Sequence, residues 1–185
     1  MPLPPSLTDL TSRVREFDER IDTAFDRLRG HKVADRAFYA ASELGDFSLI
    51  WHLVGAARGL TSDRRADEAI RLSVVLAAES VLINGVVKSF FRRRRPVWDP
   101  LVKRPHRLRR PRSSSFPSGH ASAAFTAATL LAEDDPLWPL YYAAAAFVAS
   151  SRTYVKIHHA SDVVAGAATG IVLGTIARKV WPKPE

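Results

Sequence analysis

Three stretches of the chain carry no charged side chain, and they restrict the folds open to it. They span residues 121–132, 137–151 and 163–177 and are built mainly from alanine, leucine, valine and glycine. Further apolar segments at 38–57 and 72–87 contain only scattered polar side chains. No segment shows the alternation of apolar and polar residues that marks a strand. The pattern therefore predicts an all-α fold, a helical bundle.

The same stretches favour an integral membrane protein, with a soluble bundle of buried helices as the alternative. No uncharged stretch reaches the roughly 18 to 20 residues that would establish a bilayer span by length alone. However, Gly166, Gly170 and Gly174 recur at every fourth position of an apolar helix, which allows membrane helices to approach closely. Tryptophans lie at the margins of apolar segments, where a membrane interface is expected, at Trp51, Trp98, Trp138 and Trp181. We therefore expect a multi-pass protein of a bacterial inner or plasma membrane.

Residues 6–30 differ from the rest because charged side chains surround a narrow apolar stripe. The stripe follows the helical spacing of three and four residues, at Leu10, Val14, Phe17, Ile21, Phe25 and Leu28. We expect two parts: a charged amphipathic N-terminal helix with its linker at 1–37, and the helical domain at 38–185. This helix could lie on a membrane surface or pair with a second copy, but packing against the main body is favoured.

The chain is strongly basic. It has 27 Lys and Arg against 19 Asp and Glu, a net charge of +8, and 21 of the basic residues are Arg. Arginine binds phosphate in a forked geometry, so nucleic acid, an anionic headgroup or a phosphorylated substrate is favoured as partner. A GC-rich coding sequence would produce the same bias. The absence of cysteine excludes disulfides, thiolate metal sites and cysteine nucleophiles.

Two short segments place histidines at expected helix starts. Ser118, Gly119 and His120 precede the first uncharged stretch, where free backbone amides and the helix dipole attract anions. Ser118 could also serve only as an N-cap. His158 and Asp162 are four residues apart, so on a helical first turn the carboxylate can accept the ring N–H and orient the imidazole. A helix cap and ion pair without catalysis is the alternative for such a pair.

Together with a preceding basic segment, these residues match a known pattern. Its parts are Lys88, six residues and Arg95-Pro96; then Pro117-Ser118-Gly119-His120; then Ser151-Arg152 with five residues before His158 and three more before Asp162. This arrangement resembles the three-part motif of the type 2 phosphatidic acid phosphatase superfamily, with no departure at a motif position. The resemblance covers residues 88–162 and extends to about residue 38, without the N-terminal helix.

The resemblance implies a metal-independent phosphatase that uses no cofactor. His158 would attack phosphorus to form a phosphohistidine, Asp162 would hold its ring, and His120 would protonate the leaving alkoxide. The implied phosphate-binding residues are Lys88, Arg95, Ser118, Gly119 and Arg152. His159 is left out of this set because it faces elsewhere on a helical turn. No metal site is expected, since no carboxylate cluster with ligand spacing accompanies the histidines.

Membrane helices favour a lipid phosphate as substrate: phosphatidic acid, phosphatidylglycerol phosphate or a polyprenyl-linked phosphate. A polyprenyl diphosphate or a polyprenyl sugar phosphate is the alternative. A basic protein that binds nucleic acid or an anionic membrane through residues 92–112 is the non-enzymatic alternative, but it leaves the histidine spacing unexplained, so no specific nucleic-acid partner is expected. The loop 88–117 carries 11 Lys or Arg and one acidic residue, which favours a site facing the cytoplasm.

Overall fold

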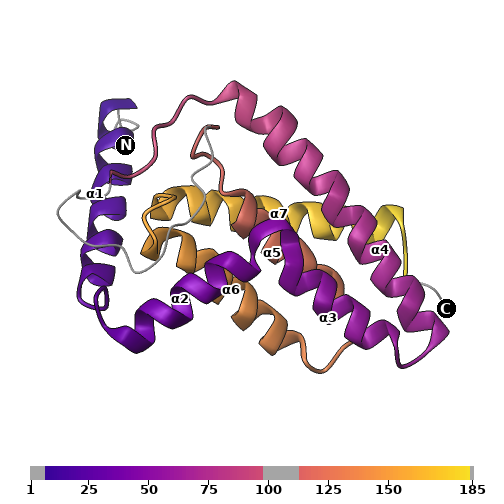
Figure 1. The fold of residues 1–185 in the computed structure, drawn as a ribbon. Helices are drawn as coiled ribbons and strands as arrows, with labels where there is room; N and C mark the ends of the chain where they lie inside the picture. The colour runs from indigo at the N-terminus through magenta and orange to yellow at the C-terminus, as the bar shows by residue number, and fades with distance from the viewer. Residues whose placement is uncertain (1–6, 98–112, 184–185) are drawn as a thin grey trace.

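The computed structural model describes residues 7–97 and 113–183, and every regular element in these ranges is helical (Figure 1). In chain order the elements are α1 (Leu7–Asp26), α2 (Lys32–Leu44), the short 3-10 helix η1 (Asp46–Ser48), α3 (Leu49–Gly59), α4 (Asp63–Ser80), α5 (Gly119–Leu131), α6 (Trp138–Tyr154) and α7 (Ala160–Val180). Helix α4 continues into a π-helical segment, η2 (Val81–Val86), and a 3-10 segment, η3 (Val87–Phe90). The predicted all-α class is confirmed.

Helix α5 forms the centre of the bundle. It packs against α7, α6 and α4, and its small side chains are nearly all buried. Gly166, Gly170 and Gly174 of α7 face it. A Cβ at the first two glycines would overlap the backbone carbonyl oxygens of Ser118 and Ser122. The small-residue ridge therefore brings α7 into backbone contact with α5, as glycine spacing of this kind allows.

Two helices are long and apolar enough to cross a membrane, as judged by length and composition: the continuous helix Asp63–Phe90 and α7. The tryptophans only partly follow the expected interfacial positions. Trp138 and Trp181 are exposed at the ends of their helices, whereas Trp51 is buried in the core of the bundle. The prediction for Trp51 is wrong because α3 packs that face against α4. Trp98 lies outside the described residues.

The apolar segment 38–57 is divided between two helices, α2 and α3. Helix α2 ends at Leu44, and Phe47 and Ser48 have positive φ angles of 53° and 58°. Gly45 lies at this break, and a Cβ there would come within 2.8 Å of the His120 ring. The break therefore brings the backbone of 45–48 against the start of α5.

Helix α1 lies across the end of the bundle at which α7 begins (Figure 1), and it packs against α6 and α7. The Phe25 ring meets the Tyr154 ring edge-on, and Arg29 donates a 2.8 Å hydrogen bond to the Tyr154 carbonyl. Helix α2 starts at Lys32, so the division expected after residue 37 falls inside it. The N-terminal helix is thus attached to the end of the bundle where the candidate site lies.

Candidate active site

The three motif segments meet at one cavity of about 470 Å³. It lies where α5 and α7 begin and where the long α4–η3 helix ends. Predicted site residues that line it are Lys88, Gly119, His120, Arg152 and His158. The other three lie next to these: Arg95 contacts His158, Ser118 caps α5, and Asp162 is buried beside His158. The structure therefore brings together all eight predicted site residues.

His158 lies in the turn between α6 and α7 and is almost completely buried. Its Nε2 atom is 3.2 Å from Nη1 of Arg95. A guanidinium has only donors, so Nε2 must accept this hydrogen bond, which leaves the ring proton on Nδ1. Burial lowers the pKa of His158 to about 3, and the charges of Arg152, Arg95 and Lys88 act in the same direction against Asp162. The imidazole is therefore neutral, with its lone pair on Nε2.

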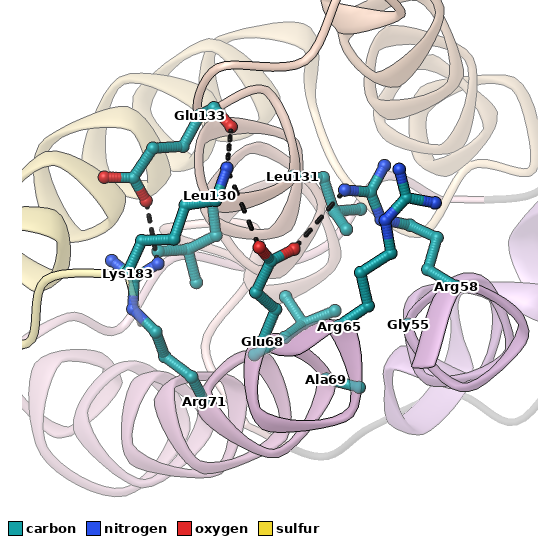
Figure 2. A pocket seen from close by; sticks show the side chains of 11 residues that line it. Gly55, Arg58, Arg65, Glu68, Ala69, Arg71, Leu130, Leu131, Glu133 and Lys183 are labelled. Atoms are coloured by element: carbon teal, nitrogen blue, oxygen red, sulfur yellow. Dashed lines mark hydrogen bonds and ion pairs between the residues drawn. The ribbon is translucent and has the colours of Figure 1, made fainter. Parts of the chain in front are cut away.

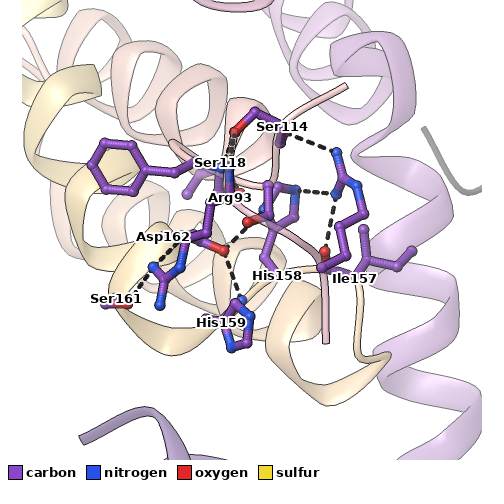
Figure 3. A network of polar contacts seen from close by, with 12 residues as sticks. Arg93, Ser114, Ser118, Ile157, His158, His159, Ser161 and Asp162 are labelled. Carbon is purple, nitrogen blue, oxygen red and sulfur yellow. Dashed lines mark hydrogen bonds and ion pairs between the residues drawn. The ribbon is translucent and has the colours of Figure 1, made fainter. Parts of the chain in front are cut away.

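Asp162 does not make the hydrogen bond to His158 that the four-residue spacing predicts. Its Oδ2 atom is 3.7 Å from Nδ1 of His158, which is an ion-pair distance and too long for a hydrogen bond. The carboxylate instead accepts the backbone N–H of His159 at 2.9 Å and Nη1 of Arg93 at 2.6 Å (Figure 3). Asp162 thus faces the Nδ1 side of the His158 ring, and its carboxylate is held in place by the His159 N–H and by Arg93.

His120 is the second residue of α5, and its Nε2 atom is 2.8 Å from Oδ1 of Asp46. Burial lowers the pKa of His120 to about 4; Arg152 and Lys88 contribute to the decrease, and Asp46 opposes it. In the sequence, Asp46 is one of the scattered polar side chains of the apolar segment 38–57. Its proximity to Gly45, the residue at the helix break, was the available signal for a role at the site.

Two buried cations, Lys88 and Arg152, lie at the wall of the cavity, together with the carboxyl groups of Asp46 and Glu79. Lys88 donates to Oδ1 of Asn84 at 2.8 Å, one helical turn earlier. Arg152 is buried and donates to the side-chain oxygen of Ser42 on α2. With Arg95 beside Nε2 of His158, these groups suit a phosphate dianion. Asn84 could have been identified from its four-residue spacing to Lys88, whereas Ser42 carries no local signal.

The start of α5 adds backbone donors to this wall. Ser118 is the N-cap: its side chain accepts from the Ala121 N–H at 3.4 Å, and its own N–H donates to the Asp162 carbonyl at 3.0 Å. Ser118 therefore caps α5, and Gly119 follows at the lining of the cavity. His159 caps α7, and its Nε2 atom lies 3.2 Å from the Arg94 carbonyl. Most of the basic loop, at 98–112, lies outside the described residues.

A second polar cluster lies at the opposite end of the helices (Figure 2). Its cavity is only about 20 Å³ and is closed by ion pairs, such as Arg71 to Glu133 at 2.7 Å and Arg58 to Glu68 at 3.5 Å. Lys183 also donates to the Glu133 carbonyl at 3.0 Å. This space is too small for a phosphate ester, so the cavity at His158 is the candidate site. Within 7–97 and 113–183, no group of three His, Asp or Glu side chains is arranged to hold a metal.

Comparison with known proteins agrees with this geometry. The profile of the PAP2 superfamily matches residues 68–184, more than half of the chain. The chain belongs to the PAP2 superfamily. The transmembrane PAP2-type phosphatidylglycerolphosphate phosphatase from Bacillus subtilis superposes with a TM-score of 0.69 and 25% identity, covering 94% of this chain and 88% of that chain. Aquifex aeolicus LpxE superposes with a TM-score of 0.67 and 26% identity, covering 89% and 93%.

Two sequence relatives are phosphatases. The decaprenylphosphoryl-5-phosphoribose phosphatase of Mycobacterium tuberculosis is 27% identical over 140 residues, which are 75% of this chain and 76% of that protein. The lipid A 1-phosphatase of Porphyromonas gingivalis is 42% identical over 69 residues. That match covers 35% of this chain and 16% of the relative, so it is confined to a small part of that protein.

Proposed function

We propose that this PAP2 protein is a lipid phosphate phosphatase that works through a phosphohistidine at His158. The observation that carries the proposal is the neutral His158 ring, whose Nε2 lone pair points to the Arg95 guanidinium. Lys88 and Arg152 line the adjoining cavity. An unprotonated nitrogen among cations supports nucleophilic attack on a bound phosphate, because the cations hold the phosphate oxygens while the lone pair faces phosphorus.

In the first step, Nε2 of His158 forms a bond to phosphorus and the ester P–O bond breaks. Arg95 leaves Nε2 for a phosphate oxygen, and Lys88 and Arg152 bind the remaining charge. The developing positive charge on the ring is stabilised by Asp162, which faces Nδ1. His120 acts from its protonated form, which is the minor form at neutral pH because its pKa is about 4, and donates that proton to the leaving alkoxide.

In the second step, water attacks phosphorus and His120 accepts a proton from it. The P–N bond breaks, orthophosphate leaves, and His158 returns to the neutral state. Asp46 favours the protonated form of His120 and so supports both transfers. These steps use side chains of this protein only, and we expect them to proceed without a metal ion or cofactor.

The surroundings of the cavity support a membrane lipid as the phosphate carrier. Phe47 lines the cavity and is largely exposed, and Val81 and Phe90 expose apolar side chains on the long helix nearby. Such a border suits a substrate whose phosphate enters the cavity while its chain stays in the bilayer. Phosphatidic acid, phosphatidylglycerol phosphate and polyprenyl-linked phosphates share this shape.

A polyprenyl sugar phosphate is the second candidate. It is favoured by the similarity over three quarters of both chains to the decaprenylphosphoryl-5-phosphoribose phosphatase. We place the protein as a multi-pass protein of a bacterial inner or plasma membrane, with the site facing the cytoplasm because the loop 88–117 is so basic.

The proposal is tested by phosphate release from phosphatidic acid and from a polyprenyl phosphate in detergent micelles, with EDTA present. We expect activity in EDTA, inhibition by vanadate, and an acid-labile ³²P label on the protein. His158→Ala should abolish both turnover and label, whereas His52→Ala on α3, whose ring contacts Ser73, should retain them. Activity that requires added magnesium or zinc would contradict the metal-independent mechanism. Salt-dependent DNA binding without turnover would support the non-enzymatic alternative.

A further inference from the structure

Asp18 of α1 is buried although it belongs to a helix whose other charged side chains are mostly exposed: its exposed fraction is 7%. Its carboxylate accepts the Ser161 N–H at 2.8 Å and the Ser161 hydroxyl at 2.9 Å. Ser161 is in the first turn of α7, so Asp18 supplies that helix start with an acceptor from a distant part of the chain. The profile match at 68–184 does not include Asp18.

Arg93 joins this carboxylate to the one beside the nucleophile. Its Nη2 atom donates to Asp18 at 2.6 Å, and its Nη1 atom donates to Asp162 at 2.6 Å and to Ser161 at 2.8 Å. Figure 3 shows Arg93 between Ser161 and Asp162, with His158 on the other side of Asp162. His159 also approaches Asp18, with 4.0 Å between its Nδ1 atom and Oδ2.

Asp18, Arg93 and Asp162 together determine the net charge beside the His158 ring. Asp162 is needed as an anion opposite Nδ1 of His158, because phosphorylation at Nε2 places positive charge on the ring. Arg93 orients the Asp162 carboxylate, but its positive charge alone would cancel the negative charge of Asp162. Asp18 offsets the charge of Arg93, so the three groups together keep one negative charge while Asp162 stays oriented.

We propose that Asp18 is a positioning residue for the reaction at His158, acting through Arg93 on Asp162. The N-terminal helix would then be part of the catalytic apparatus. This role rests on the proposed phosphohistidine mechanism. It differs from a purely structural attachment of α1, because it depends on the charge of Asp18 as well as on the contact.

Helix α1 has other attachments, so the role can be separated from folding. Arg29 donates to the carbonyls of Thr153 and Tyr154, and Lys156 pairs with Asp22 at 2.9 Å. Asp22 lies one turn after Asp18 on the same helix and contacts neither Arg93 nor Asp162 in the hydrogen bonds and ion pairs of the described residues. Asp22→Asn is therefore a matched control: it weakens the attachment of α1 without changing the charge next to Arg93.

The experiment compares phosphate release by the full chain in detergent for wild type, Asp18→Asn, Asp22→Asn and the double variant Asp18→Asn/Arg93→Gln. We expect Asp18→Asn to lower kcat about tenfold with KM within twofold, and Asp22→Asn to match wild type; this scale corresponds to the loss of one charge-assisted hydrogen bond. The double variant should be faster than Asp18→Asn, because removing Arg93 restores the charge of Asp162. If Asp18 served only to attach α1 to the bundle, the double variant would instead be slower than Asp18→Asn.

Three results would overturn the role: an unaffected Asp18→Asn, equal losses in Asp18→Asn and Asp22→Asn, or a double variant slower than Asp18→Asn. An inactive wild-type protein would overturn the proposed function and this role with it. An active wild type with an unaffected Asp18→Asn would overturn this role alone.

Discussion

Replacing Asp46 by Asn should slow hydrolysis of lipid substrates about fivefold and leave an activated aryl phosphate nearly unaffected. The Asp46 and His120 side chains are 41% and 19% exposed, with 2.8 Å between their closest atoms. Water screens a pair this exposed, and such pairs contribute about 1 kcal/mol. At 1.4 kcal/mol per factor of ten, losing the carboxylate lowers the protonated fraction of His120 about fivefold.

The assay compares kcat for phosphatidic acid with kcat for p-nitrophenyl phosphate. In the proposed mechanism an alkoxide takes a proton from His120 as it leaves, whereas nitrophenolate leaves without one, so only the lipid reaction should slow. Glu43→Gln is the control, because Glu43 is an exposed carboxylate on α2 close to Asp46 in the chain. In a His120→Ala background, Asp46→Asn should cause no further loss.

Two results would refute this reasoning. Equal losses on the lipid and the aryl phosphate would mean that Asp46 does not act through proton donation to the leaving group. A further loss when Asp46→Asn is added to His120→Ala would mean that Asp46 contacts the substrate or shapes the cavity independently of His120.

Three other predictions concern stability and orientation. Because burial lowers the pKa of His158 from 6.5 to about 3, the unfolded chain binds the proton more tightly, so the stability present above pH 6.5 falls as the pH drops. Between pH 6.5 and 5, unfolding in detergent should show His158→Gln losing about 1.6 kcal/mol less than wild type. Gly170→Ala should lower the unfolding free energy by about 1–3 kcal/mol, because its Cβ would overlap the Ser122 carbonyl, whereas Gly85→Ala, with open space around it, should not. With single cysteines at the exposed positions Ser113 and Asp134 of this cysteine-free chain, an impermeant thiol reagent on intact cells should label position 134 only; labelling at 113 alone would reverse the proposed orientation.

The helices and the motif residues could be predicted because their signals are local. Uncharged stretches indicate buried helices, and the spacing of His158 from Asp162 lies within one helical turn. The partners Asp18 and Asp46 could not be found this way. They reach Ser161 and His120 across 143 and 74 residues of sequence, and such contacts depend on how the helices pack. Arg93 was part of a visible basic run, but nothing local distinguished it from its neighbours.

The incorrect prediction for Trp51 has a physical cause. Trp51 was expected at a membrane interface because it was taken to lie at the margin of an apolar segment. Apolar content does not show that Phe47 and Ser48 adopt positive φ angles, which interrupt the helix. Once the helix is broken there, α3 turns Trp51 into the core, and Asp46 reaches the site.

Because α7 approaches α5 so closely, the cavity wall has two parts that differ in how readily they accept substitutions. His120 lies in the first turn of α5, and His158 lies in the turn just before α7. The two helices touch through backbone atoms, at Gly166 and at the hydrogen bond from Ser118 to Asp162. The separation of the two histidines is therefore set by main-chain contact. The remaining wall is formed by residues of η1 and of the long α4–η3 helix, together with Gly45. Substitutions there can change which phosphate ester fits the cavity while the distance between His120 and His158 stays the same.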